Sequence, residues 1–334
     1  MNSLERYRST VAGEPTDILP RVPILMQFAA EHIGSNYGAF AADHRVLVEA
    51  NIRCLDEFGF DQVSCISDPY RETQGFGAEI EFLRDTVPRC VMPPLADAKD
   101  LSLLLSPDPL VAERMFDRVQ AARAFSRRVG GRCSVLGWVE GPGAEAADLR
   151  DVMNFLIDSM EDISFCCELM DRCVDVAIAF AGAQVEAGVD TVGIGDAIAS
   201  QVTPDFYDAH VQPREKRLVD AIRDMGAWSK LHICGDISHI LPGVADLGVD
   251  VLDVDHMVDL ASVRDAVGGD VVIAGNVDPV SCVRQGTPSQ IRDSVARCYE
   301  AAGNPFMVNA GCEIPAGTPL DNLRAFCEPV PYQR

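Results

Sequence analysis

Short runs of β-branched and other apolar residues recur along the chain, and longer segments with helical periodicity separate most of them. Apolar runs of about four to eight residues bounded by Gly, Asp, Asn or Cys are typical of buried strands. Strands are therefore expected at eight places, over residues 22–27, 61–67, 133–139, 189–195, 228–234, 249–254, 270–275 and 305–310. Helical spacing marks residues 45–58, 110–129, 160–187 and 205–226.

Strands that alternate with helical segments predict βα units and a parallel sheet. Eight such units favour a closed α/β barrel of the (β/α)8 TIM type over an open sheet. The gap between residues 67 and 133 is long and rich in proline, so we expect an insertion after the second strand, with a hairpin around 78–92. No linker or change of composition marks a second domain, and a single domain over 1–334 is expected.

Charge and composition narrow the possible partners. With 28 basic and 51 acidic residues the net charge is −23, which leaves no basic footprint for nucleic acid or anionic lipid. Neither a long apolar stretch that could span a membrane nor a secretory signal is visible, so a cytoplasmic location is expected. Of the 12 cysteines, ten have apolar or helix-like neighbours and are expected to pack as small hydrophobic residues: Cys54, Cys65, Cys90, Cys133, Cys166, Cys167, Cys173, Cys282, Cys298 and Cys327.

Polar side chains follow the predicted strands, where a barrel places its active site. Helix N-caps would explain some of them, because Asp and Asn are favoured there, but their number points to a polar pocket. They are Asp68, Glu140, Asp196, His232, Cys234, Asp253, Asp255, Asn276 and Cys312.

His232 and Cys234 stand two positions apart on one predicted strand, so both side chains point to the same face. Cys312 follows the last predicted strand. Two thiolates and an imidazole with an open fourth position are typical of catalytic zinc, and Asp255 could fill that position. His232 could instead be an ordinary core histidine, or the base of a Cys312 nucleophile, although the latter leaves Cys234 without a role.

The segments 231–236, 274–279 and 309–315, together with 67–69, 138–142 and 193–196, resemble the uroporphyrinogen decarboxylase superfamily. More narrowly, the His-x-Cys and distant Cys resemble its corrinoid-dependent methyltransferases, and the similarity covers nearly the whole chain. The resemblance implies a methyltransferase that works with methylcobalamin on a separate corrinoid protein. Decarboxylases of this superfamily carry two arginines after the first strand, and residues 26–32 here have none. Porphyrinogen decarboxylation is therefore a remote alternative, as is a barrel that only stores a structural zinc ion.

The resemblance leaves two methyl acceptors open. A zinc-activated thiol such as coenzyme M would need a cation for its sulfonate, and the nearest basic residues, Arg71, Arg214 and Lys230, could all be surface residues. This favours tetrahydrofolate, whose pterin ring both donates and accepts hydrogen bonds. Catalytic hydrogen bonds to the pterin are expected from Asp68, Asp196 and Asn276, and the same residues with Glu140 are expected to bind the co-substrate.

Overall fold

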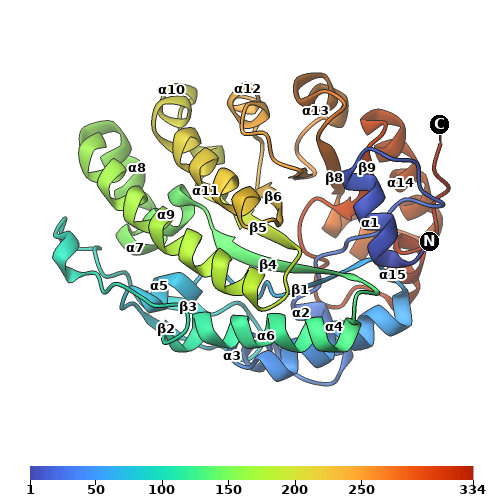
Figure 1. Ribbon diagram of the computed structural model, residues 1–334, viewed down its shortest axis with the longest axis horizontal. Helices are drawn as coiled ribbons and strands as arrows, with labels where there is room; N and C mark the ends of the chain where they lie inside the picture. Colours follow the sequence, from blue (N-terminus) through green and yellow to red (C-terminus); the bar gives the residue numbers. More distant parts are fainter. Residues whose placement is uncertain (334) are drawn as a thin grey trace.

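The computed structural model describes residues 1–333 and contains a curled sheet of seven parallel strands, wrapped by helices (Figure 1). The strand order β1-β4-β5-β6-β7-β8-β9 follows the sequence, so each strand pairs with the next one after a helical crossover. The α/β barrel-type fold predicted from the alternating pattern is confirmed. The strands are β1 (Gln62–Ser64), β4 (Ser134–Glu140), β5 (Thr191–Gly195), β6 (Trp228–Ile233), β7 (Val251–Val254), β8 (Val272–Val277) and β9 (Phe306–Ala310).

The first predicted strand, 22–27, is not a regular strand, and this part of the prediction is wrong. The chain there makes one isolated parallel bridge, from Arg21 to Val308 in β9. It still contacts both edges of the sheet, because the Val22 N–H donates to the Val308 carbonyl at 2.9 Å and the Asp61 N–H donates to the Arg21 carbonyl at 2.7 Å. Pro20 and Pro23 lack the N–H that a strand ladder needs, so an extended segment takes the place of the eighth strand.

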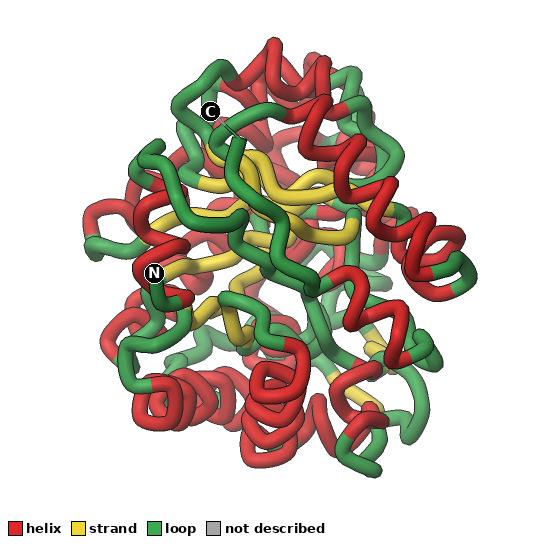
Figure 2. The backbone as a smooth tube through the Cα atoms, turned by 90° about the vertical axis from the view of Figure 1, so that its right-hand side faces the viewer, coloured by secondary structure: helices red, strands yellow, loops and turns green. Residues whose placement is uncertain are grey.

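Figure 2 shows the strands in the centre with helices around them. The helix predicted over 160–187 is divided at Asp162, whose side chain accepts the Phe165 N–H at 3.3 Å and starts a new helix. The one predicted over 205–226 contains a π-helical turn over 207–211. The helices are α1 (Ser3–Val11), α2 (Gln27–His32), α3 (Tyr37–Ala42), α4 (His44–Phe58), α5 (Arg71–Gly75), α6 (Glu113–Val129), α7 (Pro142–Arg150), α8 (Val152–Glu161), α9 (Ile163–Glu186), α10 (Pro204–Phe206), α11 (Gln212–Asp224), α12 (Leu241–Ala245), α13 (Leu260–Val267), α14 (Pro288–Ala302) and α15 (Leu320–Phe326).

The insertion after β1 contains the predicted hairpin, made of the antiparallel strands β2 (Glu79–Glu81) and β3 (Arg89–Met92). Hairpin and α5 both follow the carboxyl end of β1, and Val87 in the hairpin loop reaches the cavity described below. The insertion therefore contributes to the mouth of the barrel.

An ion-pair network ties the start of the chain to the sheet. Asp61, fully buried before β1, accepts hydrogen bonds from Arg6 of α1 at 2.5 Å and from the Arg21 side chain at 3.0 Å. Tyr7 of the same helix packs with Val251 and Val272 in a small apolar cluster of inward-facing strand residues. Helix α1 thus packs against one end of the barrel, and the other end is left for the site. Over the described residues, no helix has the length and apolar character needed to span a membrane.

Candidate metal centre

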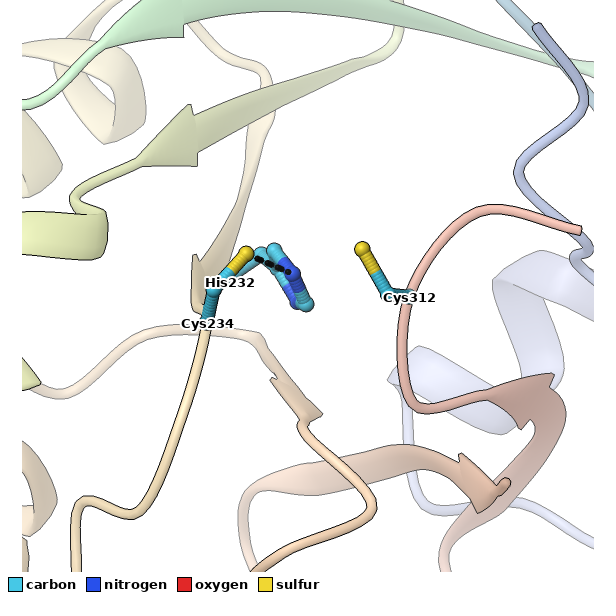
Figure 3. Close-up of side chains that lie close together, drawn as sticks. All are labelled: His232, Cys234 and Cys312. Atoms are coloured by element: carbon cyan, nitrogen blue, oxygen red, sulfur yellow. Dashed lines mark hydrogen bonds between the residues drawn. The ribbon is translucent and has the colours of Figure 1, made fainter. Parts of the chain in front are cut away.

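His232, Cys234 and Cys312 converge at the mouth of the barrel, with their ligand atoms all within 4.8 Å of one another. His232 is the penultimate residue of β6, Cys234 follows that strand, and Cys312 lies in the loop after β9 (Figure 3). Gly311 lets this loop approach the segment that follows β7, because a Cβ there would lie 2.2 Å from the backbone nitrogen of His256. Curling of the sheet therefore brings β6 and β9 together, although two strands separate them.

The His232 ring is held in one orientation. Its Nδ1 lies 3.2 Å from the Asp253 carbonyl oxygen and its Nε2 lies 3.2 Å from the Cys234 sulfur. In the neutral form of the ring, which is the form that binds a metal, a proton on Nδ1 satisfies the carbonyl and leaves the Nε2 lone pair facing the two sulfurs. With only 5% of its surface exposed, the ring has little freedom to turn away.

The three groups shift one another's acidity. Cys234 lowers the pKa of Cys312 to about 4 with help from His232, although burial opposes this. Burial acts to lower the pKa of His232, but Cys312 and Asp253 raise it to about 9. Proximity to Cys312, together with burial, raises the pKa of Cys234. One thiolate is therefore stabilised before any ion binds.

The three ligand atoms, two sulfurs and an imidazole nitrogen, have the chemistry and the spacing that a zinc site requires. Bond lengths of about 2.3 Å to sulfur and about 2.0 Å to nitrogen in a tetrahedral site place ligand atoms roughly 3.5–3.8 Å apart. All three ligand atoms lie within 4.8 Å of one another, and the 3.2 Å between His232 Nε2 and Cys234 Sγ is within a few tenths of an ångström of that spacing. Thiolate and imidazole are also the ligands that zinc prefers over oxygen donors.

A cavity of about 350 Å³ opens directly onto the three residues. One part of its wall is apolar and another part carries three carboxyl groups. The apolar part consists of Ile24, Met26, Tyr37, Ile66, Pro69, Val87 and Trp138, and the carboxyl groups are those of Asp68, Glu140 and Glu313. The Trp138 indole N–H donates to Glu140 at 3.1 Å and the Tyr37 hydroxyl donates to the Ser67 carbonyl at 2.7 Å, so the polar atoms of these rings are satisfied.

Asp68 and Glu140, two of the residues predicted for the site, line this cavity. Asp68 accepts hydrogen bonds from both Nη atoms of Arg114, at 2.9 and 2.6 Å. Burial alone would raise the pKa of Asp68, but Arg114 and Arg71 outweigh it and hold the pKa below its usual value. Glu140 accepts from Arg71 at 2.6 Å, yet burial still raises its pKa well above the usual value.

Asp196, Asn276 and Asp255 are placed elsewhere. Asp196 is fully buried and accepts the N–H groups of Gly143 and Ala144 at the start of α7, while Asn276 donates its amide to the carbonyls of Asp255 and Val258. The Asp255 carboxylate accepts the N–H groups of Gly235 and Met257 and lies outside the ligand cluster. Each carboxylate or amide therefore binds the local backbone, as the N-cap and turn alternative anticipated, and none of the three residues lines the cavity.

Several cavity residues were not predicted from the sequence. Trp138 belongs to the segment 138–142 that resembles the family, and Glu313 directly follows Cys312, so position alone could have suggested both. Tyr37 and Val87 come from irregular parts of the chain, where nothing in the residue pattern signals proximity to the site. Among the ten other cysteines, six are buried as expected, and Cys90, Cys167, Cys282 and Cys298 are only half-buried.

Carboxyl groups continue from Glu140 into α7, where Glu145 is buried and Asp148 is half-buried. Burial and the nearby Glu72 and Asp68 raise the pKa of Asp148 from 3.8 to about 8, although Arg71 opposes this. Between pH 4 and 8 the folded chain therefore holds a proton that the unfolded chain has lost, and stability falls as pH rises through this window.

We expect Asp148→Asn to remove this dependence. The melting temperature of the variant should exceed that of the unmodified protein by a margin that grows as pH is raised from 5 to 8, measured by circular dichroism. A margin that stays constant with pH would contradict the raised pKa of Asp148.

The family model described as uroporphyrinogen decarboxylase (URO-D) matches residues 2–331. The chain therefore belongs to this family. Methylcobamide:CoM methyltransferase MtbA of Methanosarcina mazei is 28% identical over 333 residues, covering 97% of this chain and 96% of the relative. Uroporphyrinogen decarboxylase of Gloeobacter violaceus is 28% identical over 295 residues, covering 85% and 82%.

A solved structure described as a methyltransferase from Methanosarcina mazei superposes with a TM-score of 0.90 at 23% identity, covering 98% of this chain and 97% of the other. At that identity the superposition supports the fold. The resemblance to the family and to its corrinoid-dependent methyltransferase branch is confirmed, and the chain is an enzyme of this kind.

Proposed function

We propose that this enzyme transfers a methyl group from a methylated corrinoid, carried by a separate protein, to a small thiol. The convergence of His232, Cys234 and Cys312 at the cavity carries the proposal. A zinc ion held by these residues would lower the pKa of a thiol, so that the nucleophilic thiolate exists near neutral pH. The similarity to methylcobamide:CoM methyltransferase MtbA of Methanosarcina mazei supports the same reaction type.

The step balances without another reactant. The thiol loses its proton to solvent, and a sulfur electron pair forms the new C–S bond. The electrons of the Co–C bond remain on cobalt, which passes from Co(III) to Co(I). Apolar side chains such as Trp138 and Ile66 line the approach and limit the water that could compete with sulfur.

Tetrahydrofolate, the acceptor favoured by the sequence, is replaced by the thiol in this proposal. Two of the three side chains assigned to the pterin, Asp196 and Asn276, do not line the cavity, and their polar atoms bind the local backbone. The third, Asp68, is paired with Arg114 through both carboxylate oxygens. The named acceptor of the methyltransferase relatives is coenzyme M, which is a thiol.

Porphyrinogen decarboxylation is the alternative activity, because a uroporphyrinogen decarboxylase is also among the relatives. The helix that would carry the expected arginines, α2 (Gln27–His32), contains none. The polar wall of the cavity offers carboxyl groups rather than partners for a substrate rich in carboxylates. The geometry therefore favours methyl transfer.

The test is direct. Zinc-loaded protein should convert methylcobalamin and a thiol to the S-methyl product, followed by absorbance and mass spectrometry. A chelator should abolish the reaction, and added zinc should restore it. Parallel incubations with tetrahydrofolate or uroporphyrinogen should give no methylated or decarboxylated product. Folded, zinc-loaded protein that methylates tetrahydrofolate but no thiol would contradict the proposal.

A further inference from the structure

A pair of opposite charges lies inside the barrel, just below the metal centre. Lys230 of β6 and Asp253 of β7 are each only 1% exposed, and the Lys230 ammonium lies 3.0 Å from the Oδ2 atom of Asp253. Lys230 stands two positions before His232 on the same strand, so the two side chains point to the same face of the sheet. The sequence allowed Arg71 and Lys230 to be surface residues, but the structure buries both.

Stability alone does not account for this pair. Val251, two positions before Asp253 on β7, belongs to an apolar cluster inside the barrel, so the pair borders an apolar interior. Removing two charges from water is costly, and apolar residues of similar volume are often at least as stable in such a place. Among the described residues, Asp253 is the only anionic partner of Lys230. The position of the pair, next to a metal ligand, points to a role in the site.

The Asp253 carboxylate faces the ring of His232. Its Oδ2 atom lies 3.9 Å from the Nδ1 atom of His232, and the Asp253 carbonyl oxygen lies 3.2 Å from the same nitrogen. The carbonyl therefore accepts the Nδ1–H, while the carboxylate acts on the ring through its charge. A negative charge on this side favours the ring form with the proton on Nδ1 and makes Nε2, which faces the sulfurs, a stronger ligand.

Two partners fix the carboxylate at this distance. Lys230 holds Oδ2, and the amide of Asn309 in β9 donates to Oδ1 at 2.8 Å. Asn309 is itself fully buried, and its own Oδ1 accepts the N–H of Ala310, so its amide is held in one orientation. Because both carboxylate oxygens are occupied, the Asp253 side chain cannot turn away from His232 without losing a buried contact.

We propose that Asp253 is a positioning residue for metal binding, whose carboxylate charge keeps His232 in the Nδ1–H form and strengthens Nε2 as a ligand. Lys230 and Asn309 hold this carboxylate in place. The inference rests on the metal centre of the proposed function. It adds to that centre a residue that contacts neither the ion nor the substrate.

Two lysine-free variants that differ only in the carboxylate test the proposal. Lys230→Met keeps the charge beside His232 and should bind zinc as tightly as the unmodified protein. The double variant Lys230→Met/Asp253→Asn keeps the shape but not the charge, and should bind zinc about 10–100-fold more weakly. Removing the lysine as well avoids an unpaired buried cation. Affinity is measured by competition with a chromophoric chelator at fixed pH, after circular dichroism has established that each variant folds.

A second measurement separates this role from a purely structural one. In zinc-loaded protein, the proton on Nδ1 of His232 should resonate at lower chemical shift in the double variant, because the charge that polarises the N–H is absent. Asp250→Asn is the matched control. Asp250 precedes β7 at its other end and accepts the N–H and hydroxyl of Ser229, at 2.7 and 2.8 Å, so its loss should leave zinc affinity unchanged.

Equal zinc affinity of the two lysine-free variants would overturn this inference and leave the metal centre intact. If Lys230→Met did not fold, the double variant against the unmodified protein would still decide, since equal affinity there would also overturn it. Unmodified protein that bound no zinc would remove the metal centre of the proposed function, and this inference with it.

Discussion

Cys312→Ser is expected to lose most of its bound zinc and nearly all thiol methylation. Serine replaces a soft thiolate with a poorly ionised hydroxyl, and the loop after β9 offers no other sulfur. Removing only a hydrogen-bond partner of a ligand costs about 10–100-fold in metal affinity, so loss of the ligand itself should exceed that. Zinc measured by mass spectrometry should fall below about a tenth of an ion per chain, and methyl transfer by more than about 100-fold.

Cys167→Ser is the matched control. The Cys167 sulfur also lies beside a histidine, 3.5 Å from Nδ1 of His210, but no third ligand joins them among the described residues. This variant should keep its zinc and its activity. If Cys312→Ser kept full zinc, the ligand set proposed here would be wrong. If it lost zinc but methylated thiols normally, the ion would have no part in catalysis.

Among the variants proposed here, Asp61→Ala is expected to lower the free energy of unfolding most. Asp61 is fully buried and bonds Arg6 and Arg21, whose side chains are only 7% and 8% exposed. Removing the carboxylate leaves two buried guanidinium groups without their shared partner, and breaking such a pair costs about 3–5 kcal/mol. Denaturation in urea, followed by circular dichroism, should show a lower midpoint without a proportional change in slope.

Asp17→Ala is the control for Asp61→Ala, because it removes an exposed carboxylate that also pairs with Arg6. Asp17 also pairs with Arg6, at 2.8 Å, but its side chain is 42% exposed. An exposed pair contributes about 0–1 kcal/mol, so this variant should stay near the unmodified protein. Equal destabilisation by the two variants would show that burial of the carboxylate does not decide how much these ion pairs contribute to stability.

Strand positions and the alternation of strands with helices followed from local pattern, because apolar runs and turn residues act over a few positions. For the segment 22–27, local pattern predicted a strand that the structure does not contain. Its composition is that of a strand, but Pro20 before it and Pro23 within it lack the N–H that a strand ladder needs, so the segment becomes an extended connection between the two edges of the sheet. The division of 160–187 depended on one capping side chain, Asp162, which interrupts an otherwise continuous helical pattern.

The roles of the polar residues at strand ends were harder to predict from the sequence. Asp68 and Asp196 both follow strands, yet one lines the cavity and the other caps α7. The two side chains have the same chemistry, and only the position of a neighbouring helix start decides which role each takes. For the same reason the sequence pattern predicts that Asn276 binds the acceptor, although in the fold its amide donates to two backbone carbonyls.

The sequence by itself determined that His232 and Cys234 share a face, because alternation along a strand is fixed by backbone geometry. It also set the acidic charge that argues against nucleic acid. Only the tertiary structure decided that Cys312 meets this pair, since the curl of the sheet brings β9 to β6. It alone decided that the cations near the cavity are already paired, because which charges neutralise one another depends on distances across the fold that no local pattern encodes.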